Sequence, residues 1–304
     1  MAKTGLNGIV CAASTPVSPD YRIDVTALAR HCSRVLEEGC AYVSVFGTTG
    51  EGASFPTAEK AEAIRALSES GVPAALQIPG IMTPVLSDAA GMLAAAETAG
   101  CRAALVLPPF FFTEPGNAGI VAFFDALLDR SGSSEIDLVL YNIPKFSRIS
   151  YTVELVEALL HRFGDRIAGI KDSTGDLQNG LSLVRAFPDL AVFTGDDRVM
   201  PELRLAGGAG MIGGMPNLFA GDACRTFAAP DGAETETIRR KAAKRIVAVD
   251  GNGGIAALKA MLARRYDAPG WSRLVPPLTP LSAADEATVL AALAETGYDP
   301  AQAS

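Results

Sequence analysis

The chain has 304 residues, of which 49% are hydrophobic and 20% charged, and its formal net charge at pH 7 is −8. An acidic chain of this kind is a poor partner for nucleic acid or for an anionic membrane surface, and we expect neither. A length near 300 residues often means two domains, but α/β barrels reach this size as a single one.

The few cysteines and histidines argue against a disulfide framework and against a metal centre. The five cysteines are scattered and contain no Cys-x-x-Cys pair, which favours reduced thiols. Both histidines, His31 and His161, lie within helical patterns, so we expect neither a histidine-based triad nor a metal site. No segment approaches the length of a membrane span, and the first residues lack a long apolar stretch. We therefore predict a cytoplasmic protein without a metal.

Short apolar segments alternate with amphipathic segments of helical period along most of the chain. The apolar segments predict eight strands, at Gly8–Ala13, Ala41–Phe46, Ala74–Ile78, Ala103–Leu107, Ile136–Tyr141, Ile167–Lys171, Leu190–Thr194 and Ala209–Ile212. The amphipathic segments predict helices, among them Thr26–Glu38, Thr57–Ser70, Val85–Ala99, Ile120–Asp129 and Thr152–Arg162. Eight strands that are each followed by a helix predict an α/β fold of the (β/α)8 or TIM-barrel type. A doubly wound open sheet uses the same alternation but rarely needs eight evenly spaced strands.

The strand signals stop after Asn217, and the remainder of the chain reads as helical. Three further helices are predicted at Glu234–Val249, Ile255–Arg265 and Ala283–Thr296, with a proline-rich connection at Leu274–Pro280. We therefore expect a barrel that carries the active site over residues 1–228 and a C-terminal helical extension over residues 229–304.

The segment Gly208–Gly213 matches the dinucleotide fingerprint G-x-G-x-x-G. That fingerprint must follow a strand and open a helix, with an acidic residue about 20 positions further on. Here the segment contains the predicted strand and no suitably placed acid follows it. We expect no nicotinamide cofactor.

Lys171 closes a predicted buried strand, directly before the polar, turn-forming stretch Asp172–Asp176. An ammonium group in such a place loses its hydration, so it must find a partner or become neutral. A neutral amine is a nucleophile for carbonyl compounds and forms Schiff bases. The alternative, for this residue considered alone, is a lysine whose head reaches from the strand end to solvent.

Two other strand ends carry polar groups, and active sites of barrels lie at the carboxyl ends of the strands. The segment Gly47–Gly52 offers the hydroxyls of Thr48 and Thr49 together with backbone N–H groups between glycines, which can bind a carboxylate. The alternative is a plain glycine turn with exposed threonines. Tyr141 ends the fifth predicted strand, and its phenol can either transfer protons or simply pack with one hydrogen bond.

Taken together, the motifs Gly47–Glu51, Tyr141–Pro144 and Gly169–Ser173 resemble the dihydrodipicolinate synthase/N-acetylneuraminate lyase family. Their order and spacing fit, and the resemblance extends over nearly the whole chain, including Pro276–Ser282. It implies a barrel followed by C-terminal helices, commonly assembled as a homotetramer. It also implies a lyase or aldolase that needs no metal and no organic cofactor.

The resemblance assigns a role to each strand-end residue. Lys171 would form the Schiff base with pyruvate or another 2-oxo acid, Tyr141 would donate and accept protons, and Thr48 would be its relay partner. Thr49 would bind the pyruvate carboxylate, and Ile212 would line the pocket through its backbone carbonyl. The iminium is an electron sink, so a carbon–carbon bond beta to it can break or form. The further candidate substrate-binding residues are Gly47, Ser173, Gly195, Asp197 and Arg148.

Several positions differ from the best-known relatives. Dihydrodipicolinate synthases carry a carboxylate-binding arginine where this chain has Phe146, and the sequence leaves open whether Arg148 replaces it. Phe111 stands where those synthases lend a tyrosine across a subunit interface. Sialate lyases have an acidic residue in place of Arg198 and a serine in place of Gly214.

The retained residues Gly195, Asp197 and Ser173 could contact a shorter polyol than a sialic acid. The chain thus resembles the sugar-acid branch of the family, such as 2-keto-3-deoxygluconate aldolases and related dehydratases. We predict a pyruvate-dependent Schiff-base lyase for a 2-keto-3-deoxy sugar acid, with pyruvate and an aldehyde as partners. The alternatives are 4-hydroxy-tetrahydrodipicolinate (dihydrodipicolinate) synthase and a non-catalytic 2-oxo-acid-binding regulatory protein on the same barrel.

Overall fold

Eight parallel strands form the centre of the molecule. The computed structural model describes residues 5–133 and 135–302. Residues 1–4 and 134 of the predicted barrel, and residues 303 and 304 of the predicted C-terminal extension, lie outside the described part. The strands are β1 (Gly8–Ala12), β2 (Tyr42–Ser44), β3 (Gly80–Ile81), β4 (Ala103–Val106), β5 (Asp137–Asn142), β6 (Ile167–Asp172), β7 (Ala191–Thr194) and β8 (Gly210–Gly213).

The sheet closes on itself into a barrel. Its strand order is β2-β1-β8-β7-β6-β5-β4-β3, and every pair of neighbours is parallel. The two end strands are joined by hydrogen bonds from the Ile78 N–H to the Val43 carbonyl and from the Gly80 N–H to the Val45 carbonyl, both at 2.8 Å. The predicted TIM barrel is confirmed.

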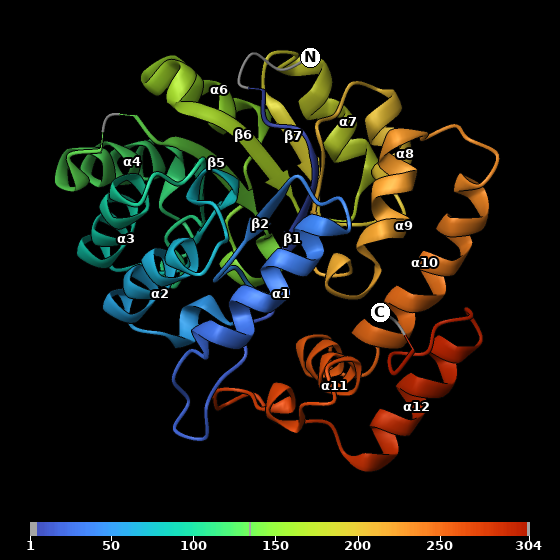
Figure 1. Cartoon of the computed structure of the whole chain (residues 1–304). Coiled ribbons are helices and arrows are strands. Elements are labelled where there is room, and N and C mark those ends of the chain that lie inside the picture. The colour runs from blue at the N-terminus through green and yellow to red at the C-terminus, as the bar shows by residue number, and fades with distance from the viewer. Residues whose placement is uncertain (1–4, 134, 303–304) are drawn as a thin grey trace.

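Helices surround the barrel, and a separate group of helices follows it (Figure 1). Around the barrel lie α1 (Val25–Glu37), α2 (Thr57–Glu69), α3 (Leu86–Thr98), α4 (Gly116–Ser131), α5 (Pro144–Ser147), α6 (Val153–Phe163), α7 (Leu177–Ala186), α8 (Met200–Leu205) and α9 (Pro216–Ala228). The C-terminal group consists of α10 (Thr235–Asp250), α11 (Ile255–Arg265) and α12 (Ala283–Ala294). Short 3-10 helices lie at Gly52–Ser54, Ala74–Leu76, Gly164–Arg166 and Pro269–Ser272.

Local sequence signals explain where several helices begin. The carboxylate of Asp24 accepts the backbone N–H of Ala27 at the start of α1, and the hydroxyl of Thr152 accepts that of Leu155 at the start of α6. The hydroxyl of Ser282 caps α12 in the same way. Such side chains satisfy backbone donors that have no partner within the helix.

The third strand differs from its prediction. Residues 74–76, expected in a strand, form a 3-10 turn after Pro73, and the strand itself lies at Gly80–Ile81. Gln77 makes only an isolated bridge with Val43. Pro79 has no N–H to contribute to the ladder, so the regular pairing begins after it. The prediction Ala74–Ile78 was therefore wrong for most of its length.

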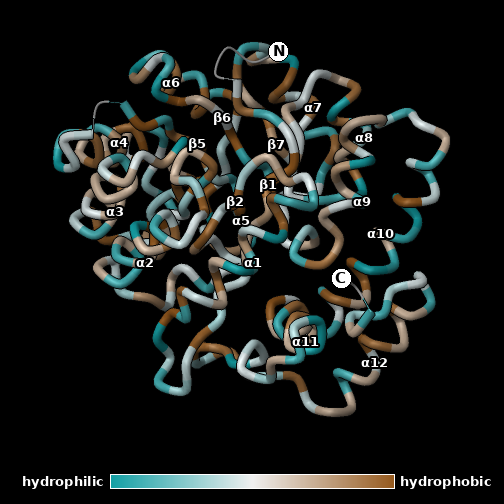
Figure 2. The backbone as a smooth tube through the Cα atoms, viewed as in Figure 1, coloured by the Kyte–Doolittle hydropathy of each residue, from teal (hydrophilic) through white to brown (hydrophobic). Residues whose placement is uncertain are grey.

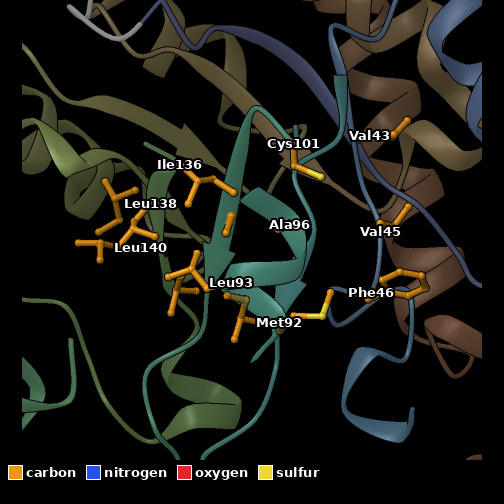
Figure 3. Close-up of a cluster of buried hydrophobic side chains, with 14 of the residues drawn as sticks. Val43, Val45, Phe46, Met92, Leu93, Ala96, Cys101, Ile136, Leu138 and Leu140 are labelled. Carbon is orange, nitrogen blue, oxygen red and sulfur yellow. The ribbon is translucent and has the colours of Figure 1, made fainter. Parts of the chain in front are cut away.

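Two apolar cores hold the barrel together. Alternate residues of each strand point outward against the helices, and Figure 3 shows members of this outer core from β2, β5 and α3. The other residues fill the barrel interior, among them Leu105, Val139 and Phe193. Figure 2 shows the matching mixture of apolar and polar residues along the helices, as expected when one helix face is buried and the other meets solvent.

The C-terminal helices have a core of their own, which includes the start of α9. Met215, Leu218 and Phe219 pack there with residues of α10, α11 and α12. His31 of α1 lies completely buried near this junction, with Nδ1 2.7 Å from the Tyr266 hydroxyl and Nε2 2.7 Å from Asn217 Oδ1. It is thus a histidine packed in the core.

No single helix in the described part of the chain has the length and apolar character needed to cross a membrane. The helix pair α10 and α11, bent by 107°, passes that test by length and composition only.

Candidate active site

Lys171 and Tyr141 face each other at the carboxyl ends of neighbouring strands. The two residues are register partners on β6 and β5, and they are only 5% and 2% exposed. The register shifts by one residue at Ala168; without that shift, Ile170 would stand opposite Tyr141. The Nζ of Lys171 lies 4.2 Å from the centre of the Tyr141 ring. A local irregularity in the sheet thus places the amine against the phenol.

The next residue along each strand holds this arrangement in place. Asn142 and Asp172 are also register partners, and the Asn142 amide donates to the Asp172 carboxylate at 2.9 Å. The same carboxylate accepts the Thr174 hydroxyl at 2.9 Å and the Asn179 amide at 3.0 Å. Because successive side chains point to opposite faces of a strand, these groups fasten the strand ends from outside while Lys171 faces inward. Within the described residues, no hydrogen bond or ion pair to Lys171 is found.

Thr48 reaches Tyr141 from the segment that follows β2. Its hydroxyl lies 3.1 Å from the Tyr141 hydroxyl, and either group can be the donor. We call residues 47–52 the catalytic loop. The loop closes on itself through a hydrogen bond of 2.9 Å from the Gly52 N–H to the Gly47 carbonyl. A Cβ at Gly52 would lie 1.7 Å from the Phe46 carbonyl oxygen, so only glycine allows this close approach.

A cavity of about 500 Å³ adjoins Thr48, whereas Lys171 and Tyr141 are not among its lining residues. Four of the predicted site residues line it, namely Thr48, Thr49, Gly195 and Asp197. The remaining lining residues are Ile143, Lys145, Phe146, Asp196, Gly214, Met215, Ile246, Asp250, Gly253, Gly254, Ile255, Leu258 and Leu278. Concave sites with a few convergent polar groups are the usual places for a small-molecule substrate.

Of the other predicted substrate-binding residues, three lie close to the barrel strands and one is exposed on the surface. Gly47 is buried in the segment after β2, and Ile212 is buried within β8. Ser173 directly follows the end of β6 at Asp172. Ser173 also packs on Gly195, because a Cβ at Gly195 would lie 2.5 Å from its hydroxyl. Arg148 is exposed after α5 and does not line the cavity, so its role in substrate binding stays a prediction.

The cavity wall is acidic on one side. Burial, with a smaller effect of the neighbouring Asp196, raises the pKa of the Asp197 carboxyl to about 7. Burial also raises the pKa of Asp250, and Lys145 opposes this shift. This shift favours the neutral acid, which can donate a hydrogen bond as well as accept one.

The C-terminal helices contribute to the site, which the sequence did not predict. Asp250 from the end of α10, and Ile255 and Leu258 from α11, line the cavity together with Leu278. The predicted helices carried no signal for this role, since helical periodicity shows which face is buried but not what it packs against.

Among the described residues, no group of three or more His, Cys, Asp or Glu side chains is arranged to hold a metal ion. The polar groups gathered here are an amine, a phenol and two hydroxyls, which suit covalent carbonyl chemistry.

Comparisons with known proteins agree with this geometry. The model of the dihydrodipicolinate synthetase family matches residues 5–296. A DapA-like lyase of Chloroflexus aurantiacus is 31% identical over 287 residues, which cover 94% of this chain and 95% of that protein. A 4-hydroxy-tetrahydrodipicolinate synthase of Methylococcus capsulatus is 31% identical over 241 residues, or 78% and 80% of the two chains.

Solved structures show the same relationship. Dihydrodipicolinate synthase from Agrobacterium tumefaciens is 29% identical, superposes with a TM-score of 0.88 and shares 96% of this chain and 99% of its own. YagE of E. coli, solved in complex with pyruvate, is 20% identical with a TM-score of 0.86, covers 96% and 99% of the two chains and supports the fold alone. The chain therefore belongs to the dihydrodipicolinate synthetase family and is a lyase of the class that works through a Schiff base on a lysine.

Proposed function

We propose that this lyase joins or releases pyruvate and a neutral hydroxyaldehyde, so that its substrate is a 2-keto-3-deoxy sugar acid. The observation that supports the proposal is the grouping of Lys171, Tyr141 and Thr48 beside a cavity whose charged lining is mainly carboxylate. The relay of phenol and hydroxyl favours turnover over a non-catalytic 2-oxo-acid binder, which would need no proton transfer.

Pyruvate enters the proposed cycle at Lys171. The neutral amine attacks the C2 carbonyl, and the resulting carbinolamine loses water to give the iminium. Tyr141, 3.1 Å from Thr48, supplies the proton that leaves with the hydroxyl and later takes a proton back. Thr49 and the backbone N–H groups of the catalytic loop would hold the carboxylate without a cation.

The second half of the cycle makes or breaks the carbon–carbon bond. Loss of a C3 proton from the iminium gives an enamine, whose C3 attacks the carbonyl carbon of the aldehyde while the aldehyde oxygen takes up a proton. In the opposite direction the same electrons flow back and the aldehyde is released. Water then hydrolyses the iminium and frees Lys171.

The cavity wall supports a neutral, hydroxyl-rich partner. Among the described residues that line it, the charged ones are Asp196, Asp197 and Asp250, with Lys145 as the cation, and none is an arginine. Carboxylate oxygens accept hydrogen bonds from sugar hydroxyls but repel a second carboxylate. Phe146 lines the cavity without a charge. By the family resemblance, it stands where dihydrodipicolinate synthases have their carboxylate-binding arginine.

The second candidate is 4-hydroxy-tetrahydrodipicolinate synthase, because several relatives carry that name. The deciding experiment compares kcat/KM for a panel of 2-keto-3-deoxy sugar acids with that for pyruvate plus aspartate semialdehyde. A higher value for a sugar acid supports the proposal. A higher value for aspartate semialdehyde overturns the proposed substrate and favours the second candidate.

We also propose that the chain assembles as a homotetramer. Phe111 and Phe112 are 83% and 78% exposed in the loop after β4, although large apolar side chains rarely project in pairs from a free surface. A second copy could cover them. Sedimentation equilibrium of the wild type and of Phe111→Ser/Phe112→Ser should show a tetramer that the double substitution dissociates, and a monomeric wild type would contradict the proposal.

A further inference from the structure

Glu51 is a buried acid that the proposed chemistry does not use. It lies in the catalytic loop three residues after Thr48, and its side chain is 0% exposed. Its φ of 53° and that of Phe46, 60°, lie in the left-handed region that non-glycine residues rarely adopt. Both residues adjoin the turn that presents the two threonines, so this turn needs support from its surroundings.

Glu51 supplies part of that support through an ion pair with the C-terminal helices. Its Oε1 lies 2.6 Å from the Nζ of Lys259 on α11, whose side chain is also 0% exposed. Its Oε2 accepts the backbone N–H of Val275 at 2.8 Å. One carboxylate thus ties the catalytic loop to two segments of the C-terminal extension.

Lys259 extends the same network to the barrel. Its Nζ also donates to the Thr15 carbonyl at 2.8 Å, and the Thr15 hydroxyl donates to the Gly50 carbonyl at 2.7 Å. The catalytic loop is therefore held both at Gly50 and at Glu51. Leu258, next to Lys259, lines the cavity.

Stability alone does not account for such a pair. Removing two charges from water is costly, and a well-packed apolar pair of the same volume is often at least as stable. Burial lowers the pKa of Lys259, and Glu51 opposes that shift. The property that an apolar pair lacks is a fixed geometry, because the carboxylate accepts in two defined directions.

We propose that Glu51 and Lys259 are positioning residues, which hold the catalytic loop so that Thr48 stays within hydrogen-bond distance of Tyr141. Through them the C-terminal extension, which contributes to the cavity wall, also holds the proton relay in place. The inference rests on the proposed function, since its readout is proton transfer on bound pyruvate.

Three variants and one matched control test the proposal. Glu51→Gln keeps the size and the acceptor for Val275 but removes the charge, and Lys259→Met removes the amine. Glu51→Gln/Lys259→Met removes both charges, so it leaves no unpaired buried charge that could prevent folding. The control is Glu38→Gln, because Glu38 also bonds α11 to the barrel, with Arg265 Nη2 at 2.8 Å, but does so away from the catalytic loop.

The readout is exchange of the C3 protons of pyruvate for deuterium, followed by NMR and normalised to folded protein. We expect the double variant to lose roughly 10²-fold in exchange rate, the usual effect of a misplaced catalytic group. It should still form the borohydride adduct, since Lys171 is untouched. Glu38→Gln should exchange at the wild-type rate even where its Tm is lower.

A double-mutant cycle with Thr48→Val separates positioning from a general loss of structure. If the pair acts through Thr48, Thr48→Val should lower the exchange rate by a much smaller factor in the double variant than in the wild type. Independent, multiplicative losses overturn the proposal, and so does an exchange rate in the double variant equal to that of Glu38→Gln. Failure of the wild type itself to exchange protons or form an adduct overturns the proposed function instead.

Discussion

The Nζ of Lys171 lies 4.2 Å from the ring centre of Tyr141, its register partner on the neighbouring strand. Such a contact stabilises an ammonium through the negative face of the ring. The same geometry leaves the phenol beside any carbonyl compound that reacts with the amine. The proposed nucleophile and the proposed proton donor are therefore positioned by one strand pairing.

The first prediction concerns the covalent bond. Borohydride reduction in the presence of pyruvate should leave one reduced pyruvate, an N-(1-carboxyethyl) group, per chain on Lys171. Lys171→Ala should abolish the adduct while the fold is retained. Lys145→Ala is the matched control, because Lys145 also lines the cavity and should not be needed. Peptide mass mapping gives the answer, and an adduct on Lys145 would refute the assignment.

The second prediction concerns the proton relay. Tyr141→Phe should lower kcat by about 10²- to 10⁴-fold, the usual contribution of general acid–base catalysis. Thr48→Val should lower it less, because water can partly replace the hydroxyl that lies 3.1 Å from the phenol. Steady-state kinetics on the preferred substrate provides the test. Unchanged turnover in Tyr141→Phe would mean that another group transfers the proton.

The barrel was predictable because its signals are local. An apolar segment followed by a helical pattern recurs eight times, and one such unit needs no knowledge of the others. The position of the third strand was predicted wrongly for the same reason. The apolar run 74–78 looks like a strand on its own, but Pro73 and Pro79 limit which backbone N–H groups can pair.

The site was predictable only where its residues belong to motifs. Lys171, Tyr141 and Thr48 stand at strand ends, so the barrel topology brings them together. The ion pair between Glu51 and Lys259 joins residues 208 positions apart, and neither residue shows its partner in the sequence. Asp250, a polar residue at the end of α10, was likewise not recognisable as part of the cavity wall.

The third prediction concerns substrate choice. Phe146 lines the cavity, and replacing it by arginine should restore a charge-assisted contact worth roughly 1.5–3 kcal/mol to a substrate carboxylate. At 1.4 kcal/mol per factor of ten, Phe146→Arg should raise kcat/KM for aspartate semialdehyde by about 10- to 100-fold. Arg148→Ala should change little, since Arg148 does not line the cavity. A wild type that prefers aspartate semialdehyde and loses this preference in Arg148→Ala would show that Arg148 already binds the carboxylate.

The fourth prediction concerns the dependence of stability on pH at the junction of α1 with the C-terminal helices. Asn217 Oδ1 accepts the backbone N–H of Ser14, so the His31 Nε2 beside it must donate, and Nδ1 is left to accept from Tyr266. In this arrangement the imidazole is neutral, and its burial disfavours the charged form. Burial lowers the pKa of His31 from 6.5 to about 3, the hydrogen bond to Asn217 opposes this shift, and Arg34 adds to it.

The direction of the pH dependence follows from the number of protons that the folded and unfolded chains bind. Below pH 6.5 the unfolded chain binds a proton at His31 that the folded chain does not bind, so acid favours unfolding. The contribution of His31 to the free energy of unfolding should fall by about 1.4 kcal/mol per pH unit between pH 6.5 and pH 3. Asp197, whose folded-state pKa is raised, acts in the opposite direction, so only a comparison of variants isolates His31.

Urea unfolding of the wild type and of His31→Gln at pH 7.5, 6.5 and 5.5 provides that comparison. His31→Gln should be less stable at every pH. Between pH 6.5 and pH 5.5, however, its free energy of unfolding should fall by about 1 kcal/mol less than that of the wild type, because the unfolded imidazole is already half protonated at pH 6.5. His161→Gln is the matched control, because His161 is exposed on α6 and should leave the wild-type slope unchanged. Equal slopes in the wild type and His31→Gln would show that His31 accepts a proton in the folded state, in conflict with the burial that lowers its pKa.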